Sequence, residues 1–92
     1  MSVAERIDEA SRDGVVRLEA DEVEVLIDQA EIIRTDSTGI AGRIRTLRLG
    51  GRILVQERNP EHEHFLRVLA DEDIAQQFIE KRLADYDRMW DG

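Results

Sequence analysis

Residues 43–58 read RIRTLRLGGRILVQER, and this stretch decides the fold of the chain. Two runs of alternating apolar and polar residues flank Gly50-Gly51. Two glycines between such runs indicate a two-residue hairpin turn, because both accept positive φ without steric cost. A turn of this length places Leu47 opposite Leu54. Neither face of the hairpin is uniformly polar, which leaves a bulge or a shifted register as an alternative.

The hairpin also concentrates positive charge. Residues 37–56 contain four arginines and no acidic residue, whereas the whole chain has a net charge of -8. Charges are screened within roughly 8 Å at physiological salt, so a local patch can act despite acidic surroundings. The candidate contacts are Arg43, Arg45, Arg48 and Arg52. Three or more of them on one open face would favour a partner, and a scatter over both faces would favour pairing with the chain's own carboxylates.

The size and composition of the chain exclude several classes of protein. Ninety-two residues make one small domain, residues 1–92, or a fragment of a longer chain. Apolar residues make up 41 % of it, which argues against a disordered tail. The absence of cysteine excludes disulfides and thiolate metal sites. No apolar run is long enough to span a bilayer or to serve as a secretory signal, so we expect a cytoplasmic protein without membrane contact.

Helices are predicted at the two ends of the chain. Ser2 begins an S-x-x-E capping box, and Gly14 is typical of a helix end, which together predict a short N-terminal helix. Asp71 is a suitable N-cap for the nineteen residues 72–90, which would span roughly 28 Å and cross a whole sheet face. The apolar stripe of this long helix comprises Ala75, Phe78, Ile79, Leu83, Tyr86, Met89 and Trp90.

Short strands are predicted between these helices. Residues 15–18 and 65–69 have strand character, and the second segment would pair antiparallel to the hairpin. Residues 22–35 fit both a strand alternation and a helical stripe. Their β-branched residues favour two short strands with a turn near Asp28-Gln29. We therefore expect an α+β fold, in which an antiparallel sheet of about five or six short strands around the hairpin is covered on one face by the long amphipathic C-terminal helix.

Two histidines raise the question of a metal site. His62 and His64 would point to one side of an extended segment, with glutamates beside them. No spacing marks a third and a fourth ligand, so a solvated turn is the simpler interpretation and we expect no metal or other cofactor. The chain has no nucleophile elbow, P-loop or metalloprotease motif, and we expect no enzyme.

The sequence indicates contact surfaces but no motif that determines a biochemical function. We expect a small non-catalytic protein-interaction or adaptor domain that forms a homodimer through the end of the last helix, the arginine-rich hairpin or both. Trp90 would anchor the interface beside Tyr86 and Met89, because tryptophan is enriched at interface centres. Otherwise these three residues pack on the chain's own sheet. The alternatives are a nucleic-acid-binding domain that uses the basic hairpin, residues 43–52, and a small-ligand or enzyme domain.

Overall fold

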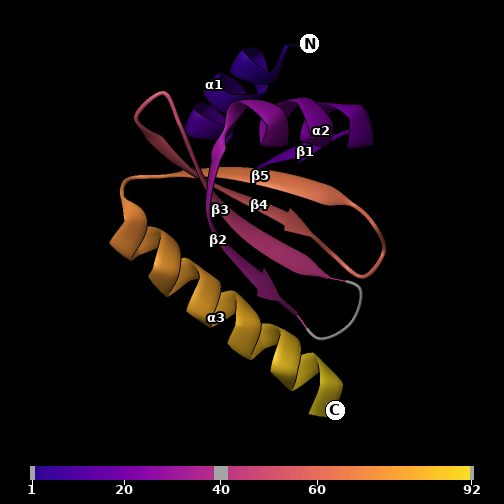
Figure 1. Cartoon of the computed structure of the whole chain (residues 1–92). Coiled ribbons are helices and arrows are strands. Elements are labelled where there is room, and N and C mark those ends of the chain that lie inside the picture. Colours follow the sequence, from indigo (N-terminus) through magenta and orange to yellow (C-terminus); the bar gives the residue numbers. More distant parts are fainter. Residues whose placement is uncertain (1, 39–41, 92) are drawn as a thin grey trace.

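The computed structural model describes residues 2–38 and 42–91, with side chains up to Arg88. In chain order the elements are α1 (Val3–Asp13), β1 (Val16–Leu18), α2 (Ala20–Gln29), β2 (Glu31–Ser37), β3 (Arg43–Leu49), β4 (Arg52–Arg58), β5 (His64–Leu69) and α3 (Glu72–Asp91). Figure 1 shows α1 and α2 on one side of the sheet and α3 on the other. The predicted α+β class and the long C-terminal helix on one face of the sheet are confirmed.

The strands form one antiparallel sheet of five strands in the order β1-β5-β4-β3-β2. The β3–β4 hairpin has the predicted register, with Leu47 opposite Leu54. Its turn residues Gly50 and Gly51 have φ values of 57° and 78°, which only glycine adopts at no steric cost. A register shift, considered above as an alternative for the hairpin, occurs instead in the pairing of β2 with β3, between Ile32 and Arg34.

The predicted helix ends are confirmed. The Ser2 hydroxyl accepts a hydrogen bond from the Glu5 backbone N–H at 3.2 Å, and α1 ends before Gly14, whose φ is 90°. At the start of α3, the Asp71 carboxylate accepts from the Ile74 backbone N–H at 2.8 Å. Each side chain satisfies an amide that has no partner within its own helix. Within the described residues, no helix combines the length and the apolar character needed to cross a membrane.

The prediction for residues 22–35 was wrong in its first half. In place of the first of two strands, the chain forms helix α2 up to Gln29, and β2 then follows. The helical pattern is the correct one because Val23 and Leu26, on the inner face of α2, are buried, whereas Val25 is 44 % exposed. A β-branched residue in a helix costs only a few tenths of a kcal/mol, so burying two apolar side chains outweighs that preference.

The sheet buries one apolar cluster on each face. The cluster under α1 and α2 comprises Val3, Ile7, Ala10, Val16, Leu18, Val23, Leu26, Leu47, Leu54 and Leu66. The cluster under α3 comprises Ile44, Ile53, Val55, Ala75, Ile79 and Tyr86. Successive residues of a strand point to opposite faces, so the apolar run 53–55 contributes to both clusters. The hairpin lacked a clearly polar face in the sequence because each of its faces contributes to an apolar cluster beneath a helix.

Candidate functional site

The structure places two of the four hairpin arginines in ion pairs within the chain. Arg48 lies on the α3 face of the sheet and contacts the carboxylates of Glu31 and Glu72. Arg52 lies on the opposite face, where its guanidinium is 3.1 Å from the Asp8 carboxylate of α1. All of these side chains are largely exposed, so the pairs contribute little to stability. Neither arginine is left without a carboxylate partner.

Arg43 and Arg45 lie at the end of the hairpin far from its turn, and their surroundings differ from those of Arg48 and Arg52. Within residues 2–38 and 42–88, neither side chain forms an ion pair or a hydrogen bond, and the Nε atom of Arg43 is buried without a partner. Both residues alternate with Ile44 on β3 and therefore face the α1/α2 side. Burial lowers the pKa of Arg45, and the charges of Arg43 and Arg58 lower it further. The positive charge here is not neutralised by the described carboxylates.

Arg58 and His64 extend these charges into a row across three strands. In the sheet register, Arg43 is directly opposite Arg58, and Arg58 is directly opposite His64. Side chains at such positions have Cβ atoms about 5 Å apart, and like charges there destabilise the sheet. Burial lowers the pKa of the His64 imidazole, and the charges of Arg58 and Arg43 add to this effect. The row therefore has a strongly positive local potential.

Gln56 orients the imidazole in this row. Its side chain is 2 % exposed, and its Nε2 atom lies 3.2 Å from Nδ1 of His64. Because an amide nitrogen only donates, this contact favours the neutral tautomer in which Nδ1 accepts and Nε2 carries the proton. Gln56 is also directly opposite Arg45 in the register. We call Arg43, Arg45, Arg58 and His64, together with Gln56, the basic patch.

The basic patch occupies the part of the α1/α2 face where the apolar cluster ends. Leu47 and Leu54 of that cluster lie nearer the β3–β4 turn, the end of the strands at which α1 is seen in Figure 1. Towards the β4–β5 connection, the same face changes to arginines, a histidine and a glutamine. Arg43, Arg45 and His64 all retain partial exposure to solvent. The result is a half-open cationic surface.

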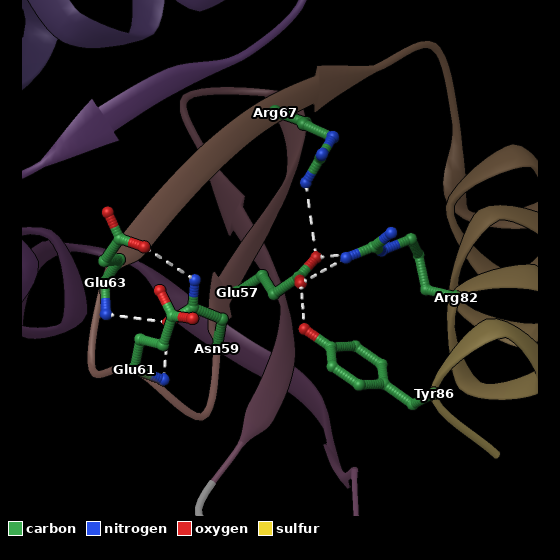
Figure 2. A network of polar contacts seen from close by, with 7 residues as sticks. All are labelled: Glu57, Asn59, Glu61, Glu63, Arg67, Arg82 and Tyr86. Atoms are coloured by element: carbon green, nitrogen blue, oxygen red, sulfur yellow. Dashed lines mark hydrogen bonds and ion pairs between the residues drawn. The ribbon is translucent and has the colours of Figure 1, made fainter. Parts of the chain in front are cut away.

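The α3 face holds a buried carboxylate with opposite properties. Glu57 is 1 % exposed and accepts from Arg82 at 2.7 and 3.2 Å, from Arg67 at 3.3 Å and from the Tyr86 hydroxyl at 2.5 Å, as Figure 2 shows. Burial alone would raise the pKa of Glu57. Hydrogen bonds from Arg82 and Tyr86, with the charges of Arg82 and Arg67, outweigh it, and the pKa is lowered. The carboxylate is ionised and fully occupied, so it joins α3 to the sheet rather than serving as a free base.

Tyr86, a predicted interface residue, belongs to this internal network. It is 5 % exposed, and the Arg82 guanidinium lies 5.2 Å from the centre of its ring. The Arg67 guanidinium is stacked in the same way over Phe78, at 4.8 Å. The other two predicted helix contacts, Met89 and Trp90, lie outside the described side chains.

The turn before β5 does not assemble the histidines into a metal centre. Asn59 organises it, because its Oδ1 atom accepts from the backbone N–H groups of Glu61 and Glu63 at 3.0 and 2.9 Å (Figure 2). The Glu63 carboxylate accepts from Asn59 at 3.1 Å and pairs with Arg17 at 3.4 Å. His62 is exposed, with a φ of 66°. Among the described residues, no group of three or more histidine, cysteine or acidic side chains is placed to hold a metal ion.

A scan against protein-family models and searches among curated proteins and solved structures found no match to this chain. Function must therefore be inferred from the geometry alone.

Sequence reasoning missed Arg58 and the part that Gln56 plays. Arg58 follows Glu57 and so lies outside the segment without acidic residues. The signal was present in the hairpin register, because counting outwards from the turn places position 58 opposite position 43. His64 was considered only as a metal ligand. Its pairing with Arg58 depends on β5 lying beside β4, and its contact with Gln56 depends on how the two side chains pack.

Proposed function

We propose that this protein is a non-catalytic binding domain that recognises an acidic segment of a partner protein on the basic patch. The supporting observation is that Arg43 and Arg45 have no carboxylate partner among the described residues of a chain with 21 acidic residues. Arg48 and Arg52, of the same hairpin, do have such partners. Clustered like charges destabilise the isolated chain, and the carboxylates of a bound partner would neutralise them.

The partner can be a different protein or a second copy of this chain. Self-association through Arg48, Arg52 or Tyr86 has little support, because the first two are ion-paired within the chain and the third is buried. The predicted contacts Met89 and Trp90 lie outside the described side chains, and among the described residues a homodimer would use the basic patch of one copy and exposed carboxylates of another. The net charge of -8 opposes approach of two copies at long range, which favours a different protein as the partner.

Nucleic acid is the less favourable anionic partner for this surface. Single-stranded nucleic acid is bound largely by stacking its bases on aromatic side chains. Phe65 lies on the opposite face, because it pairs with Glu57 in the register. Phe78 and Tyr86 belong to the packing of α3. Three arginines alone would give a salt slope of about -2.7 on duplex DNA, which is a weak electrostatic term.

The test is titration of a labelled glutamate-rich peptide by fluorescence anisotropy at about 50 mM salt, where screening is weak. The variant is Arg43→Gln/Arg45→Gln, and the matched control is Arg48→Gln/Arg52→Gln, which removes the same charge from the same hairpin. We expect wild type and control to bind alike and the variant to bind at least about tenfold more weakly.

Equal effects of the two double variants, or no binding by wild type, would refute the proposal. A labelled oligonucleotide in a parallel titration examines the alternative ligand. Tighter binding of the oligonucleotide than of the peptide would assign the patch to nucleic acid. Size-exclusion chromatography with light scattering then shows whether the protein itself is the partner, because a dimer through the patch would dissociate in Arg43→Gln/Arg45→Gln.

A further inference from the structure

The hydrogen-bond donors of the basic patch are concentrated on one transverse row of the sheet. Arg43, Arg58 and His64 occupy directly opposite positions on β3, β4 and β5. Arg45 lies two residues further along β3, on the same face. Neighbouring strands are about 4.8 Å apart, so the row extends over about 10 Å at the backbone. Arginine side chains bridge such distances readily, and their donors can converge on one small group.

The number of cations in the patch exceeds what one carboxylate neutralises. A carboxylate carries a single charge, and its two oxygens match one guanidinium in a bidentate pair. Arg43 and Arg45 alone bring two guanidinium groups that have no carboxylate partner among the described residues. A phosphate monoester carries a charge between about -1.5 and -2 at neutral pH and has three acceptor oxygens in a tetrahedral arrangement. Donors that approach from three adjacent strands suit this shape better than a planar carboxylate.

The polar atoms around the row are suited to an anion. The Nε donor of Arg43 is buried without a partner among the described residues. The contact with Gln56 leaves the His64 proton on Nε2, which makes that nitrogen a second donor. The neighbours on β2 in these rows are Thr35, opposite Arg45, and Ser37, opposite Arg43, so these two positions hold neutral hydroxyls. A carboxylate at either position would repel a dianion.

We infer that the group of the partner that binds the basic patch is a phosphate monoester, namely the phosphorylated side chain of a serine or threonine. This inference rests on the proposed function and specifies the chemistry of its ligand. Arg43 and Arg45 of β3 bind the phosphate oxygens, His64 of β5 donates through Nε2, and Arg58 of β4 contributes positive charge between them. Gln56 is a positioning residue that acts through the imidazole.

The experiment compares three peptides of one acidic sequence that carry serine, glutamate or phosphoserine at the central position. Calorimetric titration of the wild-type protein should show the phosphoserine peptide binding at least about tenfold more tightly than the glutamate peptide. Inorganic phosphate should compete with the phosphopeptide and should raise the melting temperature more than chloride at equal ionic strength. Arg43→Gln and His64→Gln should reduce the preference for phosphoserine over glutamate, whereas Arg52→Gln, the control, should retain it.

Each other outcome has a distinct meaning. Equal affinity for the glutamate and phosphoserine peptides, with loss in Arg43→Gln/Arg45→Gln, would support the acidic-partner proposal and overturn the phosphate inference. A preference for phosphoserine that survives Arg43→Gln would overturn the assignment to this row. Equal stabilisation by phosphate and chloride would show general screening and contradict a specific site. Specific stabilisation by free phosphate without binding of the phosphopeptide would likewise overturn the assignment to a phosphorylated protein.

Discussion

Replacing Glu57 by glutamine tests the part that the buried carboxylate plays in attaching α3 to the sheet. The carboxylate accepts hydrogen bonds from Arg67, Arg82 and Tyr86, which come from β5 and α3. Glutamine has nearly the same size and retains one acceptor oxygen. Its NH₂ group, however, would face donors where the second carboxylate oxygen stood. We expect Glu57→Gln to fold with a weaker attachment of α3.

The loss in the free energy of unfolding depends on how much contact with solvent Arg67 and Arg82 keep. Breaking a buried ion pair by removing one partner typically costs about 3–5 kcal/mol, because the other charge is left uncompensated. Arg67 and Arg82 keep 22 % and 29 % of their side-chain surface exposed, so water partly replaces the lost contacts. We therefore expect the lower part of that range, a loss of about 3 kcal/mol in the free energy of unfolding. A small domain with a typical stability of about 5–15 kcal/mol remains folded after such a loss.

Urea unfolding followed by circular dichroism measures this difference, and its pH dependence identifies the cause. Burial would raise the pKa of Glu57, but hydrogen bonds from Arg82 and Tyr86 outweigh it, and the pKa lies below its ordinary value of 4.5. The stability that the carboxylate contributes is therefore complete above that ordinary value and is lost as the pH falls through the lowered pKa. The difference between wild type and Glu57→Gln should accordingly shrink below pH 4.5.

Glu31→Gln is the matched control. Its carboxylate pairs with Arg48 at 3.2 Å, but 66 % of its side-chain surface is exposed, so we expect a loss below about 1 kcal/mol. Equal losses in the two variants would refute the reasoning, and so would a difference between wild type and Glu57→Gln that stays constant below pH 4.5.

Three further predictions concern the hairpin, the core and the basic patch. Gly51→Ala should cost about 1 kcal/mol, because φ at this position is 78°, and a melting temperature equal to that of wild type would contradict it. Leu54→Ala should cost about 2–5 kcal/mol in urea unfolding, because the side chain is fully buried. Val25→Ala, on the exposed face of α2, should cost almost nothing. Arg43→Gln should leave stability unchanged or raise it by up to about 1 kcal/mol at low salt, through relief of repulsion with Arg58, and this gain should vanish at high salt. A clear loss of stability at low salt would contradict this account of the patch.

The hairpin was predictable to the residue pair because its turn has a defined length. Once Gly50 and Gly51 form a two-residue turn, every cross-strand pair of β3 and β4 follows by counting. The long helix was equally accessible, since its stripe is sustained over several turns and Asp71 marks its start. Both features depend on residues that are close in sequence.

Helix α2 could not be predicted because residues 22–35 fit both a strand alternation and a helical stripe, and the two patterns differ only in which side chains they bury. The choice depends on Val23 and Leu26 meeting apolar residues from α1 and from strands formed later in the chain. Local propensity slightly favoured strands, and packing decided against them.

The same limit applies to the arginines. Arg48 and Arg52 find their partners Glu72 and Asp8 at sequence separations of 24 and 44 residues. Which arginines are neutralised is therefore a property of the fold rather than of the hairpin sequence.

The two faces of the sheet separate stability from the proposed binding. Glu57 and Arg58 are adjacent in sequence, yet strand alternation places the first under α3 and the second in the basic patch. On one face a carboxylate is surrounded by donors, and on the other cations lie directly opposite one another. Substitutions on the two faces share no contact, so the free energies of Glu57→Gln and Arg43→Gln should add within about 0.5 kcal/mol. Binding should follow only the second, because a ligand on the basic patch does not touch the residues that attach α3.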